Sequence, residues 1–169
     1  MTTIFTIGHS NHSFERFVQR LREHHFQTVV DVRLVPYSKW VPHFSKNALQ
    51  AQLPALGFHY IYLGVPLGGK SSRHRVGYVD TRANDHNRVL APDFKTAISD
   101  VINIATSSKT VLMCAEVNPE KCHRHRLLAS ALVQQSATVV HVLAQGGLLA
   151  DVDVAAKPFQ PNLFSADAF

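Results

Sequence analysis

The sequence predicts a single α/β domain with a mostly parallel sheet of about five strands and helices on both faces. Short apolar, β-branched stretches alternate along the chain with segments whose apolar residues recur at helical spacing. With 169 residues, of which 46% are hydrophobic and 17% charged, the chain is long enough for one buried core and too apolar to stay disordered. We therefore expect one domain over residues 1–169, with residues 156–169 as a strap over an apolar groove.

The first half of the chain contains three expected strands and two expected helices. The strands are placed at Ile4–Gly8, Thr28–Val32 and His59–Leu63. Ser13 and Ser45 are expected to cap the two helices, because a serine hydroxyl accepts a hydrogen bond from a free N–H of the first turn. Pro54 is expected to kink or end the second helix, since proline lacks the N–H that a helix interior requires.

The second half repeats the alternation after a long interruption. No clear periodicity is visible between Gly64 and Ala91, and long irregular segments inside domains are often functional. Asp93 is then expected to cap a third helix. The remaining expected elements are strands at Thr110–Met113 and Ala137–Leu143 and a helix from Pro119 to about Gln135, capped by Asn118.

The charge of the chain favours an anionic partner. The formal net charge is +5, and a basic group is concentrated in one region: Lys70, Arg73, Arg75, Arg82 and Arg88. This pattern is typical of a protein that binds nucleic acid or an anionic small molecule, although a solvated basic loop has the same composition. No apolar stretch is long enough for a membrane span and no signal peptide is visible, so we expect a cytoplasmic protein with reduced thiols.

Polar residues follow the predicted strands at the ends where ligands bind in open α/β sheets. If the strands are parallel, these side chains share one edge of the sheet. The candidates are His9, Ser10, Asp31, Arg33, Gly68, Gly69, Lys70, Cys114, Glu116, Cys122, His123 and Arg124.

Cys122 is the strongest candidate for chemistry. It lies near the expected start of a helix, next to an imidazole and a guanidinium, and that setting favours a thiolate. A zinc site that includes Cys114 remains open, but the sequence has no CxxC or HExxH pattern. A redox dithiol is open too. A phosphatase-type loop is excluded, because the sixth residue after each cysteine is Glu120 or Leu128 and not arginine.

Four ordered motifs resemble an uncharacterised family, number 488 of the domains of unknown function. They are T-I-G-H-S at Thr6–Ser10, D-V-R at Asp31–Arg33, L-G-x-x-L-G-G at Leu63–Gly69, and C-x-E followed by C-H-R at Cys114–Glu116 and Cys122–Arg124. The resemblance extends from about Thr6 to His141. It implies one compact α/β domain and does not imply a reaction or a cofactor.

The leading hypothesis is an enzyme that acts on a phosphate-bearing or nucleic-acid-derived anion. Cys122 is the activated thiol, Glu116 or Asp31 the general acid/base or orienting group, and His9 a proton carrier. The anion is bound by Arg33, Lys70 and Arg124, in a pocket that also includes Ser10, Gly68, Gly69, Cys114 and His123. The alternatives are a nucleic-acid-binding module without chemistry and a metal-binding protein.

Overall fold

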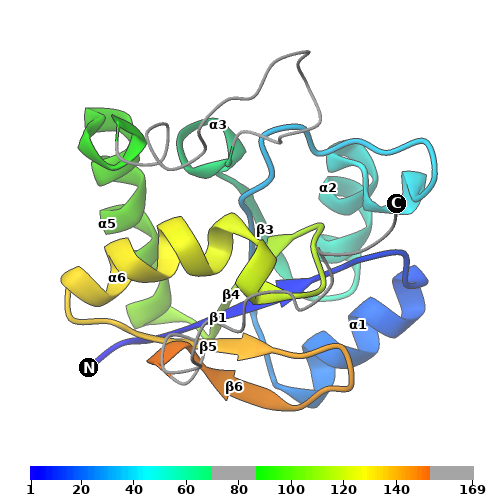
Figure 1. Cartoon of the computed structure of the whole chain (residues 1–169). Helices are drawn as coiled ribbons and strands as arrows, with labels where there is room; N and C mark the ends of the chain where they lie inside the picture. Colours follow the sequence, from blue (N-terminus) through cyan, green and yellow to red (C-terminus); the bar gives the residue numbers. More distant parts are fainter. Residues whose placement is uncertain (70–86, 153–169) are drawn as a thin grey trace, which may run out of the picture.

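Apolar, β-branched runs form the centre of one six-stranded sheet, because strands of a parallel sheet are buried on both faces. In the computed structural model, which describes residues 1–69 and 87–152, the strand order is β3-β2-β4-β1-β5-β6 (Figure 1). The first five strands pair in parallel, and β6 is antiparallel to β5. The strands are β1 (Thr3–Gly8), β2 (Thr28–Asp31), β3 (His59–Tyr62), β4 (Thr110–Cys114), β5 (Thr138–Val142) and β6 (Leu148–Ala150).

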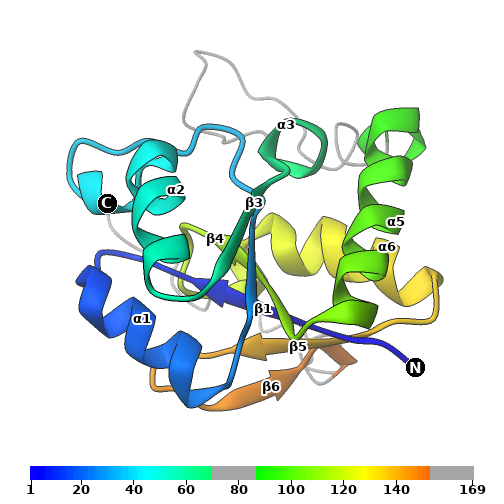
Figure 2. The ribbon, with the colours of Figure 1, turned by 180° about the vertical axis from the view of Figure 1, so that it is seen from behind.

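Helices cover both faces of the sheet, as predicted (Figures 1 and 2). The helices α1 (Phe14–Glu23) and α2 (Lys46–Ala55) pack their apolar residues into one core cluster. The helices α5 (Pro92–Ser107) and α6 (Ser130–Gln134) pack into a second cluster on the other face. The sheet therefore separates two cores, and a side chain at a strand end belongs to one face or the other.

The predicted strands agree with the structure to within one residue at each end. Within the described residues, the short elements that the prediction missed include β6, the one-turn helix α3 (Gly64–Leu67) and the 3₁₀ turn η1 (Pro42–Phe44). Three residues of β6 are too few to show an alternating pattern. The four residues of α3 include a proline, so the sequence does not indicate a helix there, since proline is usually a helix breaker.

Two of the three serine and aspartate caps are confirmed. The hydroxyl of Ser13 accepts from the N–H of Arg16 at 3.2 Å, and that of Ser45 accepts from the N–H of Ala48 at 3.4 Å. The prediction for Asp93 was wrong. Ala91 occupies the cap position of α5, and Asp93 lies in the first turn. A carboxylate there still stabilises the helix, because the N-terminal end of a helix carries a partial positive charge.

The expected helix from Pro119 to Gln135 is not continuous. A 3₁₀ turn, η2 (Pro119–Lys121), is followed by extended backbone at Cys122, with φ −111° and ψ 149°. A π-helical segment, η3 (Arg124–Ala129), then leads into α6. Asn118 caps η2 as predicted, accepting from the N–H of Glu120 at 2.8 Å. The break follows from tertiary contacts of Cys122 and Arg124, described below, which helix propensity does not include.

Several predictions fall on residues outside the described part of the chain. They concern Lys70, most of the basic group that follows it, and the strap at residues 156–169. Among the described residues, no helix has the length and apolar character needed to span a bilayer.

Candidate functional site

The parallel pairing brings the predicted strand ends to one edge of the sheet. Gly8 pairs with Cys114 across β1 and β4, and Asp31 pairs with Met113 across β2 and β4. Beyond the strands, the N–H of His9 donates to the carbonyl of Cys114 at 2.9 Å. Three separate segments therefore meet where the sequence predicts.

At this edge the candidates divide into two clusters on opposite faces of the sheet. The carboxylate cluster consists of His9, Asp31, Arg33 and Tyr60. His9 stacks on Phe44, which belongs to the core beneath α1 and α2. The thiol cluster consists of Cys114, Cys122, His123 and Arg124, and both of its cysteines belong to the core beneath α5 and α6.

Arg33 is neutralised within the carboxylate cluster. Its Nε donates to Asp31 Oδ1 at 2.9 Å and its Nη2 to Asp31 Oδ2 at 2.6 Å, a bidentate ion pair. Nη2 also donates to the carbonyl of Phe44 at 2.7 Å, and Tyr60 donates its hydroxyl to Asp31 Oδ2 at 2.8 Å. The guanidinium of Arg33 is thus directed at groups of the protein and not at an open anion site.

The hydrogen bonds of His9 define a neutral imidazole. Its Nδ1 donates to the carbonyl of Ser10 at 2.7 Å, so its Nε2 is the acceptor for Arg33 Nη1 at 2.9 Å. Burial and the guanidinium of Arg33 lower the pKa of His9 to about 4. Burial and the negative charge of Asp31 raise the pKa of Tyr60, which therefore stays protonated. Both ring nitrogens of His9 are occupied, which does not suit the proton-carrying role expected from the sequence.

The thiol cluster gathers two sulfurs, an imidazole and a guanidinium. Arg124 Nε donates to Cys122 Sγ at 3.2 Å, and the backbone N–H of Arg124 points at the same sulfur at 3.5 Å. His123 Nδ1 lies 3.7 Å from Cys122 Sγ and 3.8 Å from Cys114 Sγ. The exposed fractions of Cys122 and Cys114 are 2% and 6%, so both cysteines are buried.

Arg124 is fully buried and every nitrogen of its guanidinium is committed. Besides Cys122 it contacts Thr6 Oγ1 at 3.2 Å, the carbonyl of Glu116 at 2.5 Å and the carbonyl of Val117 at 3.4 Å. No carboxylate pairs with this guanidinium within the described residues. The group beside it that can carry a negative charge is the thiol of Cys122.

The two thiols have opposite acidities. A hydrogen bond from Cys114 lowers the pKa of Cys122 well below its usual range, against the effect of burial, and His123 and Arg124 add to the lowering. The same hydrogen bond, together with burial, raises the pKa of Cys114. The pair therefore favours a negative charge on Cys122, with the proton on Cys114.

Glycines allow three close approaches at this edge. A Cβ at Gly8 would lie 1.9 Å from the carbonyl oxygen of Glu116, and a Cβ at Gly69 would lie 2.7 Å from Cβ of His123. A Cβ at Gly68 would lie 2.4 Å from the carbonyl of Gly64. Gly69 thus lets the chain after α3 pack against His123 of the thiol cluster, whereas Gly68 lets it pack against Gly64 and Leu34.

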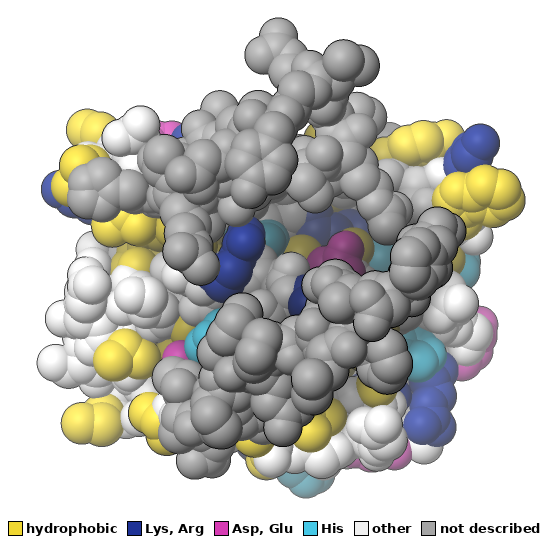
Figure 3. Space-filling view, in the orientation of Figure 1, with side chains coloured by type: hydrophobic (Ala, Val, Ile, Leu, Met, Phe, Trp, Pro, Cys, Tyr) yellow, Lys and Arg dark blue, Asp and Glu magenta, His cyan; other side chains and the backbone are white. Residues whose placement is uncertain are grey.

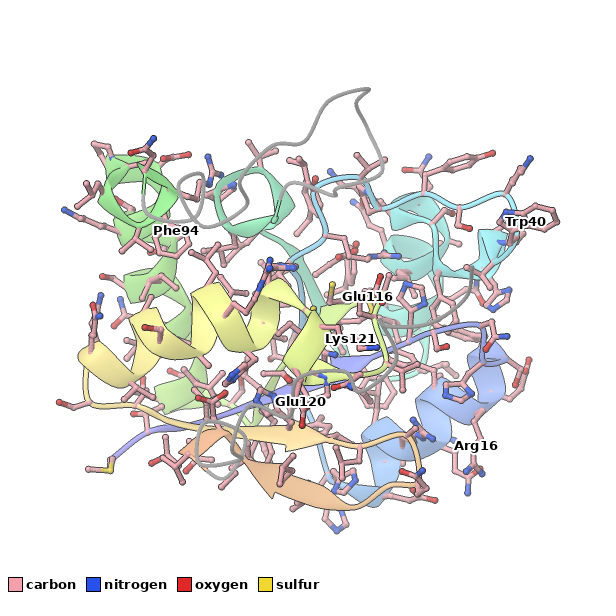
Figure 4. The ribbon with its side chains drawn as sticks, in the orientation of Figure 1. Arg16, Trp40, Phe94, Glu116, Glu120 and Lys121 are labelled. Atoms are coloured by element: carbon pink, nitrogen blue, oxygen red, sulfur yellow. The ribbon has the colours of Figure 1, made fainter. Side chains whose placement is uncertain are left out.

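Two further candidates are more exposed. Glu116 lies where β4 leads into η2 (Figure 4), with its side chain exposed and only its carbonyl held by Arg124. Ser10 adopts a left-handed conformation with φ 51°, and its hydroxyl donates to Asn11, as expected of a turn residue. Near the centre of the face in Figure 3, basic and acidic side chains lie close together.

Sequence reasoning missed several residues that the fold brings to these clusters. Tyr60 completes the carboxylate cluster, and Thr6 contacts Arg124. His141 lies fully buried in β5, where it bonds to Thr6 and to Asp151. The available signal was an imidazole inside the apolar run TVVHV, because a polar group in a buried strand needs a partner.

Comparison with known proteins identifies the family. The model of the family described as Domain of unknown function DUF488 matches residues 13–132. The chain belongs to this family. The match includes the D-V-R, L-G-G, C-A-E and C-H-R stretches, whereas T-I-G-H-S lies before it. No curated protein matches the chain, and no solved structure does either. Function must therefore be argued from the site.

Proposed function

We propose that the protein is an enzyme that uses the Cys122 thiolate as a nucleophile toward an anionic, phosphate-bearing or nucleic-acid-derived ligand. The observation that carries the proposal is the fully buried guanidinium of Arg124, 3.2 Å from Cys122 Sγ and without a carboxylate partner among the described residues. A buried charge needs compensation, and ionisation of Cys122 supplies it. Such a thiolate at the carboxyl edge of a parallel sheet is placed for covalent catalysis.

The remaining members of the thiol cluster have complementary roles in this proposal. Cys114 donates a hydrogen bond that stabilises the thiolate, and His123, near both sulfurs, transfers protons during the reaction. Glu116, exposed at the same edge, is the second acid/base group. Arg124 positions the nucleophile and, since its donors are used inside the protein, does not bind the ligand.

The carboxylate cluster has a supporting role. Asp31, Arg33 and His9 satisfy one another, so they hold the ends of β1 and β2 and take no part in the chemistry. Recognition of the anion rests instead on the net charge of +5 and on Lys121, which is exposed next to Cys122.

The proposal is tested by the pH dependence of alkylation. Wild type and the variants Cys114→Ser and Cys122→Ser are treated with iodoacetamide between pH 5 and 9, and modification of each cysteine is read by mass spectrometry. The shape of the profile reports the pKa even where burial slows the reaction. We expect Cys122 to reach its plateau rate well below the ordinary thiol pKa of about 8.5. Cys114 should remain slow throughout.

Substrate class is tested in the same assay. Inorganic phosphate, a nucleoside monophosphate and a single-stranded oligonucleotide are added separately, and slower alkylation of Cys122 identifies a ligand that covers it. If Cys122 titrates normally or does not react in the folded protein, the nucleophile is wrong. Oligonucleotide binding that falls steeply with salt and is unchanged in Cys122→Ser would support a binding module instead.

A second candidate function is metal binding by the thiol cluster. The ligand atoms of Cys114, Cys122 and His123 lie within 4.8 Å of one another, and thiolate with imidazole is a donor set that zinc accepts. Repeating the alkylation with and without a chelator separates the two candidates. Thiols that react only after chelation indicate a metal site, whereas unchanged profiles favour the free nucleophile.

A further inference from the structure

A second group of potential ligands lies on the same face of the sheet, beyond Arg124. His125 comes from η3, His141 from β5, and Asp151 directly follows β6. His125 Nδ1 and His141 Nε2 each lie 2.7 Å from the same oxygen, Asp151 Oδ1. The helical segment and the two strands that supply these residues are neighbours in the fold (Figure 1). Three side chains that are distant in the sequence thus converge on one point.

The three side chains of this group differ in how deeply they are buried. His141 is fully buried, and Thr6 Oγ1 contacts its Nδ1 at 2.7 Å while also accepting from Arg124 Nη1 at 3.2 Å. Asp151 and His125 are only partly buried, so the group opens toward the surface. Burying an imidazole in the centre of a strand costs free energy that an apolar residue would avoid. Packing alone does not account for it.

The arrangement resembles the inner ligands and supporting contacts of a metal site. A histidine that binds a metal through one ring nitrogen usually has the other held by a hydrogen bond, as Thr6 holds His141. A π-helical segment such as η3 is also a frequent feature of functional sites, because it redirects side chains. Here η3 supplies Arg124 to the thiol cluster and His125 to this group.

We propose that His125 Nδ1, His141 Nε2 and Asp151 Oδ1 bind one divalent first-row transition-metal ion, with Zn²⁺ as the reference ion. The three atoms lie within 4.8 Å of one another. Ligands at about 2.0–2.1 Å from a tetrahedral ion lie roughly 3.3 Å apart, so opening the 2.7 Å contacts by roughly 0.6 Å creates the site. Two imidazoles and a carboxylate suit zinc, iron or cobalt better than calcium or magnesium.

Metal binding is compatible with the surrounding hydrogen bonds. His141 must present an unprotonated Nε2, and its Nδ1 then donates to Thr6. The hydroxyl of Thr6 is able to accept from both His141 and Arg124, so the inner contacts survive the change of tautomer. Three protein ligands leave a tetrahedral ion with one position for water or a ligand. The proposal does not depend on the role of Cys122.

Cobalt is the probe that separates this site from the thiol cluster. Purified protein is stripped with a chelator, dialysed and titrated with Co²⁺ alone, and the absorption spectrum is recorded. Cobalt bound by thiolate shows a sulfur-to-metal charge-transfer band in the near ultraviolet, which imidazole and carboxylate ligands do not produce. The variants are His125→Gln, Asp151→Asn and the double variant Cys114→Ser/Cys122→Ser. His59→Gln, at an exposed histidine, is the matched control.

We expect one Co²⁺ per chain without a charge-transfer band, retained in the double cysteine variant and in His59→Gln. Binding should weaken by at least about tenfold in His125→Gln and Asp151→Asn, as for loss of a ligand or its support. Circular dichroism of both metal-free variants establishes that they fold. The proposal is overturned if cobalt does not bind, if all bound cobalt is lost in the double cysteine variant, or if folded Asp151→Asn binds as wild type does.

Discussion

The two clusters at the carboxyl edge each contain a buried arginine, and the difference lies in what each arginine faces. Arg33 is paired through two nitrogens with Asp31, whereas Arg124 faces the thiol of Cys122 and otherwise only uncharged oxygens. The bidentate ion pair occupies Arg33 with a group of the protein, so this pair is structural. A thiol is ionised only where its surroundings require it, so Arg124 creates a reactive group. The partner of a buried arginine therefore decides its role.

Removing the charge of Asp31 should have the largest effect on stability. In Asp31→Asn the guanidinium of Arg33, which is 7% exposed, loses its partner while remaining buried. We expect a loss of about 3–5 kcal/mol in the free energy of unfolding, measured by urea denaturation. Asp93→Asn is the control, because it removes an exposed pair with Arg88 at 3.7 Å and should cost no more than about 1 kcal/mol. Equal losses of unfolding free energy in the two variants would contradict a structural role for the buried ion pair of Asp31 and Arg33.

The histidine of the carboxylate cluster should make stability depend on pH. The pKa of His9 falls from 6.5 to about 4 on folding, so the unfolded chain binds more protons between these values. The free energy of unfolding is therefore highest, as far as His9 is concerned, above pH 6.5. It decreases by about 3 kcal/mol as the pH falls toward 4. The measurement is the free energy of unfolding of wild type and His9→Gln at several pH values. The difference between the two curves should be confined to this window, and His59→Gln should follow wild type.

The next prediction concerns the reactivity of Cys122 in the thiol cluster. In Arg124→Met, the cation beside Cys122 is lost, so the pKa of this thiol should rise. The alkylation rate at neutral pH falls only once this pKa exceeds about 7, and then by about tenfold for each further unit. The pH profile of Cys122 alkylation measures the shift. His9→Gln, which alters the other cluster, should leave the profile unchanged; a shift there would show that the two faces are coupled.

The smallest effect concerns the packing of the chain against His123. In Gly69→Ala the new Cβ would lie 2.7 Å from Cβ of His123, so the imidazole must move. We expect a cost on the order of 1 kcal/mol in thermal or urea unfolding and an altered alkylation rate at Cys122. Gly147→Ala is the matched control, since the nearest atom to its new Cβ lies 3.9 Å away. If Gly69→Ala matched wild type in both measurements, the position of His123 would not affect the reactivity of Cys122.

Local patterns of the sequence determined the fold class and the edge at which the candidates meet. The apolar runs and the serines at positions 13 and 45 are local features, and they specify strands and helix starts without knowledge of their partners. Alternation of strands and helices then requires parallel strands, whose carboxyl ends coincide. The prediction of one shared edge was therefore correct.

Tertiary structure alone decided which candidates face one another. Successive residues of a strand point to opposite faces of the sheet. Asp31, which is in register with Met113, therefore pairs with Arg33 on one face, while Cys114 lies with Cys122 and Arg124 on the other. The break at Cys122 also follows from the buried contacts of Arg124, which outweigh the helical preference of Pro119–Gln135. His125, His141 and Asp151 converge only because β5 and β6 pair beneath η3, and sequence separation conceals this contact.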